Sequence, residues 1–330
     1  MTQNRKIRWG VLGYARIARE NLIPAMGRSS NSEFYAIASR EESKLAESRA
    51  RFKVAKTFRS YDELLRDPEV DAVYIPLPNS LHREWTVKAA HNGKHVLCEK
   101  PLALNAAECR EMIAACAANR VMLMEAFMYR YTDRTRQVLE VLRSGVLGEI
   151  KFINSTFRFL LANPASIKLK PELGGGALYD VGCYPVNFIG MVLDAISGSG
   201  RGEGTLPQSV SAECTKVGGV DMIFSALLKY PSGLIASLNC GFNAQKQVFS
   251  EIVGTKGVLE IPDTFFDNAG ALTLVIGDES REIMVVQSDR YCREVEDFAD
   301  AILQNRAPHF NVDETQRNME VMDRLFAAAK

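Results

Sequence analysis

Three side chains in the sequence are of kinds that move protons in enzymes, and each lies in an unusual setting. Lys100 follows Glu99 and precedes a proline that fixes the chain, which is not the setting of an ordinary surface lysine. Asp180 and Tyr184 lie four residues apart after three consecutive glycines, so a helix would place both on one face. Lysine, aspartate and tyrosine can all act as general acids or bases. These three residues are therefore the catalytic candidates.

The segments around Lys100 come directly after apolar runs that are typical of buried strands. Ala72 to Ile75 leads into Pro76 to His82, and Val96 to Cys98 leads into Glu99-Lys100-Pro101. Ligands of open α/β sheets bind at the carboxyl ends of the strands. The residues expected to face a ligand there are Leu77, Pro78, Asn79, His82, Glu99 and Lys100.

A glycine turn follows the first apolar run, Ile7 to Gly13. The run continues into Gly13-Tyr14-Ala15-Arg16-Ile17-Ala18 and then into a helical stretch. A Rossmann unit presents backbone N–H groups to a pyrophosphate at this place. The spacing fits, but Ala15 stands where a glycine would let the pyrophosphate approach, so a purely structural turn stays open. The cofactor-binding candidates here are Gly13, Tyr14, Ala15, Arg16 and Ile17.

The end of the second apolar run indicates which dinucleotide would bind. Ser39-Arg40 stands where an NAD enzyme carries an acidic residue for the ribose 2′-hydroxyl. A cation there favours a 2′-phosphate, because the fork of Arg40 can bond phosphate and Lys44 adds a second charge. The alternative is a solvated surface arginine. We predict that Ser39, Arg40 and Lys44 select NADP(H) as the cofactor.

Apolar runs and amphipathic stretches alternate through the first part of the chain, which predicts a doubly wound parallel sheet and hence an α/β fold. We assign residues 1–128 to a Rossmann-type NADP-binding domain. The predicted strands are Ile7 to Gly13, Phe34 to Ser39, Ala72 to Ile75, Val96 to Cys98 and Val121 to Met124.

Beyond a predicted helix at Thr135 to Arg143, longer runs with two-residue alternation predict an α+β domain with a large, mostly antiparallel sheet. We assign residues 129–330 to this domain for substrate binding and oligomerisation. A helical segment near Gly176 to Leu193 interrupts its strands, and Ser197 to Pro207 is predicted to be a mobile loop. The predicted strands are Lys151 to Phe159, Val210 to Lys216, Met222 to Lys229, Leu234 to Cys240 and Val248 to Val253.

The overall composition favours a small-molecule partner. Lys plus Arg and Asp plus Glu each number 40, so no global field attracts nucleic acid or an anionic membrane. We expect no membrane association and a cytoplasmic location, because the sequence has no bilayer-spanning apolar run and its seven cysteines are scattered. We also expect no metal site, since Gly93 breaks the helix that His91 and His95 would need.

Taken together, the motifs resemble those of the glucose-fructose oxidoreductase, inositol dehydrogenase and rhizopine catabolism (Gfo/Idh/MocA) family across nearly the whole chain. The resemblance is greatest to the subgroup with NADP-dependent xylose dehydrogenase and dimeric dihydrodiol dehydrogenase. The motifs that carry it are Gly13 to Ala18, Pro78-Asn79 with His82, Glu99-Lys100-Pro101, Glu125 to Arg130, and Gly174 to Tyr184.

The resemblance implies that Lys100 and Tyr184 face the nicotinamide with Asp180 nearby, and that Met128 and Arg130 belong to the cofactor site. Inositol dehydrogenases have histidine where this chain has Tyr184, so the sugar and dihydrodiol branch is favoured. Ile167-Lys168 stands where many aldose-oxidising relatives have Trp-Arg, which leaves those substrate contacts open.

The leading hypothesis is direct hydride transfer between the nicotinamide and a sugar or polyol carbon, with Tyr184 moving the hydroxyl proton and Lys100 holding the oxygen. The alternatives are a trans-dihydrodiol dehydrogenase and a non-catalytic NADP-sensing regulator. A short-chain dehydrogenase is disfavoured, because no tyrosine has a lysine four residues later. We further expect a homodimer or homotetramer formed through the C-terminal sheet, whose strands expose more apolar surface than the helices can cover.

Overall fold

The computed structural model describes residues 5–198 and 205–329, and the chain divides into two compact units. The first comprises Met1–Ala103, Ala107–Met128 and Asp289–Val312. The second comprises Leu104–Ala106, Tyr129–Ser288 and Asp313–Lys330. This division differs from the predicted domains, 1–128 and 129–330, chiefly because a helix late in the chain returns to the first unit. Residues 199–204 of the predicted loop lie outside the described residues.

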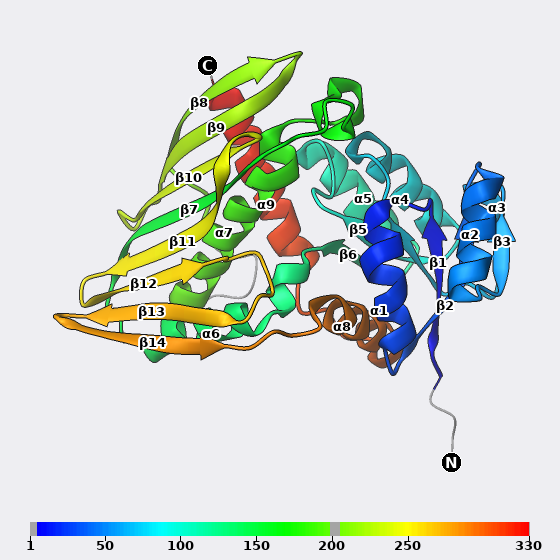
Figure 1. The fold of residues 1–330 in the computed structure, drawn as a ribbon, viewed down its shortest axis with the longest axis horizontal. Helices are drawn as coiled ribbons and strands as arrows, with labels where there is room; N and C mark the ends of the chain where they lie inside the picture. Colours follow the sequence, from blue (N-terminus) through cyan, green and yellow to red (C-terminus); the bar gives the residue numbers. More distant parts are fainter. Residues whose placement is uncertain (1–4, 199–204, 330) are drawn as a thin grey trace. The chain divides into compact units, whose positions relative to one another are not determined.

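The first unit is built on a six-stranded sheet in the order β3-β2-β1-β4-β5-β6, with every neighbouring pair parallel (Figure 1). This is the strand order of the doubly wound dinucleotide fold, so the predicted fold class is confirmed for this part of the chain. The strands are β1 (Ile7–Leu12), β2 (Ser32–Ala38), β3 (Lys56–Phe58), β4 (Ala72–Ile75), β5 (His95–Glu99) and β6 (Leu123–Ala126). The helices are α1 (Ile23–Arg28), α2 (Glu42–Phe52), α3 (Tyr61–Arg66), α4 (His82–His91), α5 (Ala106–Ala118) and α8 (Arg290–Gln304).

Two elements of this unit differ from the expectation. β3 was not predicted at all, and α8 lies outside the predicted bounds of the first domain. β3 has only three residues, all half-buried, and so shows no recognisable alternation. α8 returns to the first unit because its apolar face packs on the central sheet, where the rings of Trp9 and Phe298 lie 5.7 Å apart and neither is exposed. Burial of such large side chains supplies most of the stabilisation of a docked helix.

The second unit is built on an eight-stranded sheet in the order β14-β13-β12-β11-β7-β10-β9-β8. Only β7 and β10 run parallel, and the other pairs are antiparallel, as predicted. The strands are β7 (Ile150–Leu160), β8 (Ser209–Val217), β9 (Val220–Lys229), β10 (Ile235–Gly241), β11 (Asn243–Gly254), β12 (Gly257–Pro262), β13 (Gly270–Ile276) and β14 (Glu279–Val285). The sequence analysis found the first five of these and missed β12 to β14.

Three helices cover one face of this sheet: α6 (Asp133–Ser144), α7 (Cys183–Ser197) and α9 (Val312–Ala328) (Figure 1). Phe224 on β9 meets Phe326 on α9 with ring centroids 6.3 Å apart, and Phe224 is fully buried. The other face keeps large apolar side chains exposed, among them Phe152 and Leu227. The two-residue alternation of the strands therefore separates a covered face from an open one.

The helix that carries Asp180 and Tyr184 begins with a π-helical turn, Leu178–Gly182, before α7 starts at Cys183. Pro185 lies in the first turn of α7, directly after this π-helical turn, and a change in the helical hydrogen-bond pattern of this kind can accommodate the N–H that proline lacks. The proline is thus compatible with the helix start.

Candidate active site

The glycine turn at the end of β1 has the geometry of a nucleotide-binding loop. Gly13 has a φ of +98°, which side chains rarely adopt, and its N–H donates to Ala38 O at 2.8 Å. A Cβ atom at Gly13 would lie 3.3 Å from both Leu77 Cδ2 and Tyr61 Oη. Leu77 and Tyr61 therefore pack closely against the glycine, and together with the positive φ this contact favours glycine at the turn, as expected of a dinucleotide-binding loop.

The other predicted residues of this loop differ in exposure. Tyr14 is buried, and its hydroxyl donates to Glu47 Oε1 at 3.3 Å. Burial raises the pKa of Tyr14, so its phenol stays protonated. Arg16 is exposed, while Ala15 and Ile17 are half-buried. The side chain of Tyr14 therefore packs in the protein interior, and it is less accessible to a ligand than the side chain of Arg16.

Of the two cations predicted to select NADP, Lys44 is paired with a carboxylate and Arg40 is not. Ser39 is buried, and its Oγ accepts a hydrogen bond from the Glu41 N–H at 3.2 Å, which shapes the turn. Arg40 is exposed and makes no hydrogen bond or ion pair within residues 5–198 and 205–329. Lys44 Nζ instead lies 2.5 Å from Glu41 Oε1. Arg40 is therefore the cation available to a phosphate.

A third cation, Arg59, lies beside this edge and was not singled out from the sequence. The Ser39 N–H donates to Phe58 O at 3.1 Å, so the ends of β2 and β3 are neighbours. Arg59 follows Phe58 and pairs with Glu42 at 2.9 Å. Arg59 was not a candidate because β3 was not predicted, so the sequence did not indicate that Arg59 follows the end of a strand.

The segment that contains Lys100 is held by polar side chains on either side. Leu102 N–H donates to Glu125 Oε1 at 2.9 Å. On the preceding side, Tyr74 Oη donates to Glu99 Oε1 at 2.5 Å. Lys100 itself is half-buried. These contacts fix the backbone before and after Lys100, which is how a reactive side chain is kept in one position.

His82, predicted to bind the cofactor, is fully buried within the first unit. Its Nδ1 lies 2.9 Å from Pro101 O and its Nε2 lies 2.8 Å from Leu77 O. The imidazole thereby links the two segments that follow β4 and β5. Burial lowers the pKa of His82, and the neutral ring has one N–H to share between the two carbonyls. His82 positions the neighbours of Lys100 from inside the protein.

The remaining unit-one candidates lie along the same edge. Pro78 precedes a short 3₁₀ turn, Asn79–Leu81, and Leu77, Pro78 and Asn79 are half-buried. Met128 is half-buried at the start of a second 3₁₀ turn, Met128–Tyr131. These side chains remain proposals as cofactor contacts.

Asp180 and Tyr184 belong to the second unit, whereas Lys100 belongs to the first. Asp180 Oδ2 lies 2.6 Å from Lys168 Nζ, and that ammonium also lies 5.2 Å from the centroid of the Phe159 ring. Lys168 is the position at which the family resemblance leads one to expect arginine. Its pairing with Asp180 has no signature in the sequence, because the partners lie in different segments.

The side chain of Tyr184 is almost completely buried. Its ring centroid lies 5.3 Å from those of Phe157 and Phe265 and 5.9 Å from that of Tyr129. Aromatic rings at these separations attract one another beyond their burial. The surrounding rings therefore fix the plane of the phenol.

The glycines before this helix are required by close contacts. A Cβ at Gly176, whose φ is +125°, would lie 2.2 Å from Asp221 Oδ1. Asp221 Oδ2 also accepts from the Leu178 N–H at 2.6 Å. A Cβ at Gly175 would lie 2.6 Å from Lys168 O. Asp221, which the sequence analysis did not mention, thus holds the start of the helix that carries Asp180.

Arg130, predicted to bind the cofactor, is buried in the second unit. Its Nη1 lies 2.8 Å from Glu314 Oε2, and both side chains are almost fully excluded from solvent. Tyr129 and Asn187 complete the network through a short hydrogen bond between them. A buried ion pair of this kind is costly to break. The guanidinium of Arg130 is therefore buried and paired with Glu314, which does not support its predicted contact with the cofactor.

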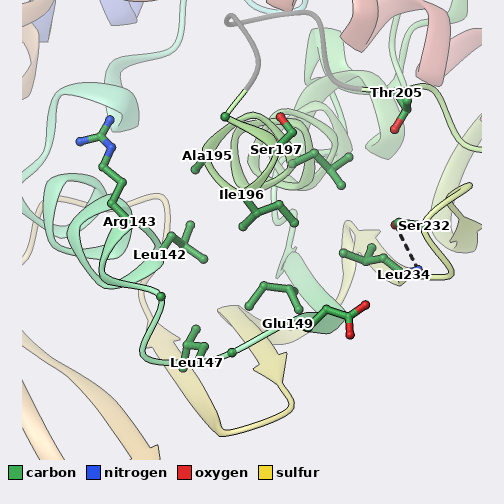
Figure 2. A pocket seen from close by; sticks show the side chains of 15 residues that line it. Leu142, Arg143, Leu147, Glu149, Ala195, Ile196, Ser197, Thr205, Ser232 and Leu234 are labelled. Carbon is green, nitrogen blue, oxygen red and sulfur yellow. Dashed lines mark hydrogen bonds between the residues drawn. The ribbon is translucent and has the colours of Figure 1, made fainter.

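A cavity of about 670 Å³ opens elsewhere in the second unit, between the ends of α6 and α7 (Figure 2). Its wall includes Leu142, Leu147, Ile196 and Leu234, and none of the predicted site residues lines it. Ser197, Gly198 and Thr205, which flank the undescribed residues 199–204, also border it.

Two general features bear on the kind of site. Among the described residues, no three His, Cys, Asp or Glu side chains are grouped so as to hold a metal ion. In the same part of the chain, no helix combines the length and apolar character that a membrane span requires.

Comparison with known proteins identifies the family. A model described as an oxidoreductase family with an NAD-binding Rossmann fold matches residues 7–127. The model of the GFO/IDH/MocA C-terminal domain matches residues 135–260. The chain belongs to the Gfo/Idh/MocA family of oxidoreductases. The predicted resemblance and the predicted enzyme class are thereby confirmed.

Members of the family that resemble this chain along nearly its whole length include D-xylose 1-dehydrogenase (NADP(+)) 2 of Haloferax volcanii. It is 36% identical over 328 residues, which cover 98% of this chain and 97% of that protein. Trans-1,2-dihydrobenzene-1,2-diol dehydrogenase of Xenopus laevis is 34% identical over 262 residues, 77% of this chain and 75% of that enzyme.

A solved member of the family has the same fold throughout. The 3-ketoreductase from Actinomadura kijaniata, in complex with NADP and TDP-benzene, matches with a TM-score of 0.91 and 29% identity. The match covers 99% of this chain and 98% of the ketoreductase. Both units of the present chain therefore follow the architecture of that enzyme.

Proposed function

We propose that this oxidoreductase uses NADP(H) to transfer a hydride between the nicotinamide and a sugar or sugar-derived hydroxyl or carbonyl group. The observation that carries the cofactor choice is the free, exposed guanidinium of Arg40 at the end of β2, where Ser39-Arg40 takes the place of the acidic residue that binds a ribose 2′-hydroxyl. The D-xylose dehydrogenase of Haloferax volcanii is named as NADP-dependent, and the related ketoreductase binds NADP.

The residues at the carboxyl edge of the first unit fit this cofactor. The glycine turn that ends β1 is suited to present backbone N–H groups to a diphosphate, and Arg40 offers a planar fork to a 2′-phosphate. When bound, the nicotinamide would donate or accept the hydride. The protein's own contribution is to hold the sugar oxygen and to move its proton.

We assign the proton transfer to Tyr184 and the holding of the oxygen to Lys100. The aromatic surroundings of Tyr184 disfavour a bare phenolate, so a nearby ammonium is needed for the tyrosine to act as a base. Lys100, fixed by its neighbours, is the proposed source of that charge. In support, the ketoreductase was also solved as a tyrosine-to-phenylalanine mutant and as two mutants of a lysine.

Asp180 is proposed to orient the sugar together with Lys168. Its carboxylate is paired at 2.6 Å with Lys168 and keeps further lone pairs with which to accept from sugar hydroxyls. Lys168 offers donors beside it. The pair supplies both hydrogen-bonding roles that neighbouring hydroxyls require.

The substrate is tested by measuring absorbance at 340 nm with a panel of pentoses, hexoses and trans-dihydrodiols with NADP⁺, and of keto-sugars with NADPH. We expect turnover with at least one sugar and with NADP(H) preferred over NAD(H). The aromatic rings around Tyr184 would also suit an apolar ring, so preferential oxidation of a dihydrodiol would instead support the second candidate function. Tight NADP⁺ binding without turnover of any compound would indicate a regulator.

We also infer a homodimer or homotetramer formed through the open face of the second sheet. A row of apolar side chains crosses this face through cross-strand partners: Ile235, Phe152, Val253, Val258 and Val275. Phe152 is 48% exposed and Leu227, in the next row, is 55% exposed. Contiguous apolar surface of this kind marks interaction sites. Light scattering at micromolar protein should give a multiple of 36.6 kDa, and a monomer mass would contradict the inference.

A cytoplasmic location is proposed for the same protein. All seven cysteines lie among the described residues and are free thiols. Free thiols are typical of reducing compartments. Fractionation of the native organism would test the assignment.

A further inference from the structure

The phenol of Tyr61 lies at the carboxyl edge of the first sheet, beside the glycine loop. The ends of β2 and β3 are joined there by the hydrogen bond from the Ser39 N–H to Phe58 O. Tyr61 follows three residues after Phe58 and begins α3. Its Oη lies 3.3 Å from the position that a Cβ of Gly13 would occupy. The hydroxyl therefore packs against the glycine itself, at the start of the proposed diphosphate loop.

The ring of Tyr61 is held in place from one side. Its centroid lies 4.9 Å from that of Trp85, at an interplanar angle of 89°, and Lys88 Nζ lies 4.2 Å above the Trp85 ring. The edge-to-face contact fixes the direction of the C–O bond. The Tyr61 hydroxyl has no hydrogen-bond partner in residues 5–198 or 205–329, although the ring is half-buried. A fixed, unpartnered donor beside a nucleotide-binding type of glycine loop is a feature expected of a ligand contact.

The charges around Tyr61 suit an anionic ligand. Burial raises the pKa of the phenol, so the group remains a donor at neutral pH, and Arg40 is close enough to act on it electrostatically. Arg40 has no carboxylate partner in the described part of the chain, whereas Glu41, the nearby acid, is paired with Lys44. Tyr61 thus lies within reach of both the glycine loop and the free guanidinium.

We propose that Tyr61 Oη donates a hydrogen bond to the adenosine ribose-phosphate portion of the bound dinucleotide. This inference rests on the proposed NADP function, in which the diphosphate occupies the glycine loop and the 2′-phosphate meets Arg40. The adenosine ribose links those two groups, and Tyr61 is the side chain between their binding residues. Tyr61 would therefore add affinity for the adenosine half without taking part in hydride transfer.

The test is the dissociation constant measured by calorimetry for NADP⁺, NAD⁺ and 2′,5′-ADP with the Tyr61→Phe variant. This change removes one oxygen and keeps the ring against Trp85, so the melting temperature should stay close to that of the parent protein. We expect the Kd for NADP⁺ and 2′,5′-ADP to rise on the order of tenfold, the usual loss for one hydrogen bond to a charged group. A similar rise for NAD⁺ would place the bond on the ribose or 5′-phosphate, and no rise would place it on the 2′-phosphate.

Tyr35→Phe is the matched control, because Tyr35 lies on the same sheet but its hydroxyl bonds Glu69, away from the glycine loop. It should bind all three nucleotides as the parent protein does. Unchanged binding of all three by Tyr61→Phe would overturn the inference and leave the proposed function standing. Failure of the parent protein to bind any of them would overturn the proposed cofactor itself, and the role of Tyr61 with it.

Discussion

The proposed catalytic lysine and tyrosine are held in contrasting ways. In the first unit, polar side chains grip the chain around Lys100: His82 contacts the Pro101 carbonyl and Glu125 accepts from Leu102. In the second unit, Tyr184 is held by the faces and edges of aromatic rings. Polar supports depend on each hydrogen bond, whereas ring packing depends on shape. The lysine should therefore be sensitive to changes in its supports, while the tyrosine should tolerate loss of its hydroxyl without loss of fold.

The largest effect is expected at the tyrosine. Tyr184→Phe keeps the ring among its aromatic neighbours and deletes the proton carrier, so kcat should fall by roughly 10² to 10⁴. The melting temperature and the Kd for NADP⁺ should hardly change. Steady-state kinetics at 340 nm, with calorimetry of NADP⁺ binding, measures both. Near-normal turnover by this variant would show that another group moves the proton.

The second effect concerns cofactor choice and compares two cations of the same edge. Arg40→Asp removes the free guanidinium and introduces the acid that suits NAD, so the ratio of kcat/KM for NADP⁺ to that for NAD⁺ should fall roughly a hundredfold. Lys44→Ala is the matched control. Because Lys44 is exposed and paired with Glu41, its loss should change this ratio only slightly. Equal effects of the two variants would contradict the assignment of Arg40.

The third effect tests the polar support of Lys100 with two histidines. His82→Leu removes the ring that links the segments after β4 and β5 and its single N–H donor, and kcat should fall about tenfold as the lysine loses its position. His95 accepts from the Met122 N–H at 2.9 Å near the other end of β5. His95→Leu should lower the melting temperature similarly but leave kcat almost unchanged. A loss of kcat as large in His95→Leu would mean that general destabilisation, not positioning, explains both.

The smallest effect is on the pH dependence of the free energy of unfolding. It compares two buried glutamates, one in each unit. Glu294 is fully buried, and neither carboxylate oxygen has a hydrogen-bond partner among the described residues. Burial, with a further contribution from Glu99, raises the pKa of Glu294 well above its usual range. Below the pKa that Glu294 has in the unfolded chain, the glutamate is protonated in both states and does not reduce the free energy of unfolding. As the pH rises from there toward the folded pKa of Glu294, the free energy of unfolding falls, because only the unfolded chain loses the proton.

The matched variants should therefore differ in sign. At pH above about 5, Glu294→Gln should be more stable than the parent protein, by an amount that grows by up to about 1.4 kcal/mol per pH unit. Glu314→Gln should be less stable, because Arg130 then keeps a buried charge without its counter-ion. Denaturant unfolding from pH 5 to pH 8 measures both changes. A pH profile for Glu294→Gln parallel to that of the parent protein would show that the pKa of Glu294 is not raised in the native state.

The same contrast between units explains what could be predicted from the sequence. Loop residues such as Gly13 and Arg40 were found because a glycine turn and a strand end have local signatures. The supports of the second unit were missed, because Lys168 pairs with Asp180 across 12 residues and Asp221 holds Leu178 across 43. Such contacts depend on the packing of distant segments, for which one sequence gives no signal.

The fold was predictable where the apolar pattern of an element is strong. It was not predictable where an element is short, or where a helix late in the chain packs on the first sheet. The buried strand Ala72 to Ile75 was placed correctly, whereas β3, with three half-buried residues, was missed. The return of α8 to the first unit has no signature in the sequence, since an amphipathic pattern does not say which sheet the helix covers. Arg130 looked like a ligand residue by its motif, and only the structure revealed its partner Glu314.

The central claim is that Lys100 and Tyr184 act on one oxygen as a single proton-transfer unit. It is tested most directly by the kcat of Tyr184→Phe, Lys100→Met and the double variant, measured at 340 nm with the best substrate of the screen. If the two residues act as a unit, the double variant should lose much less than the product of the two single losses. A double variant whose loss equals that product would show independent roles and would contradict the account.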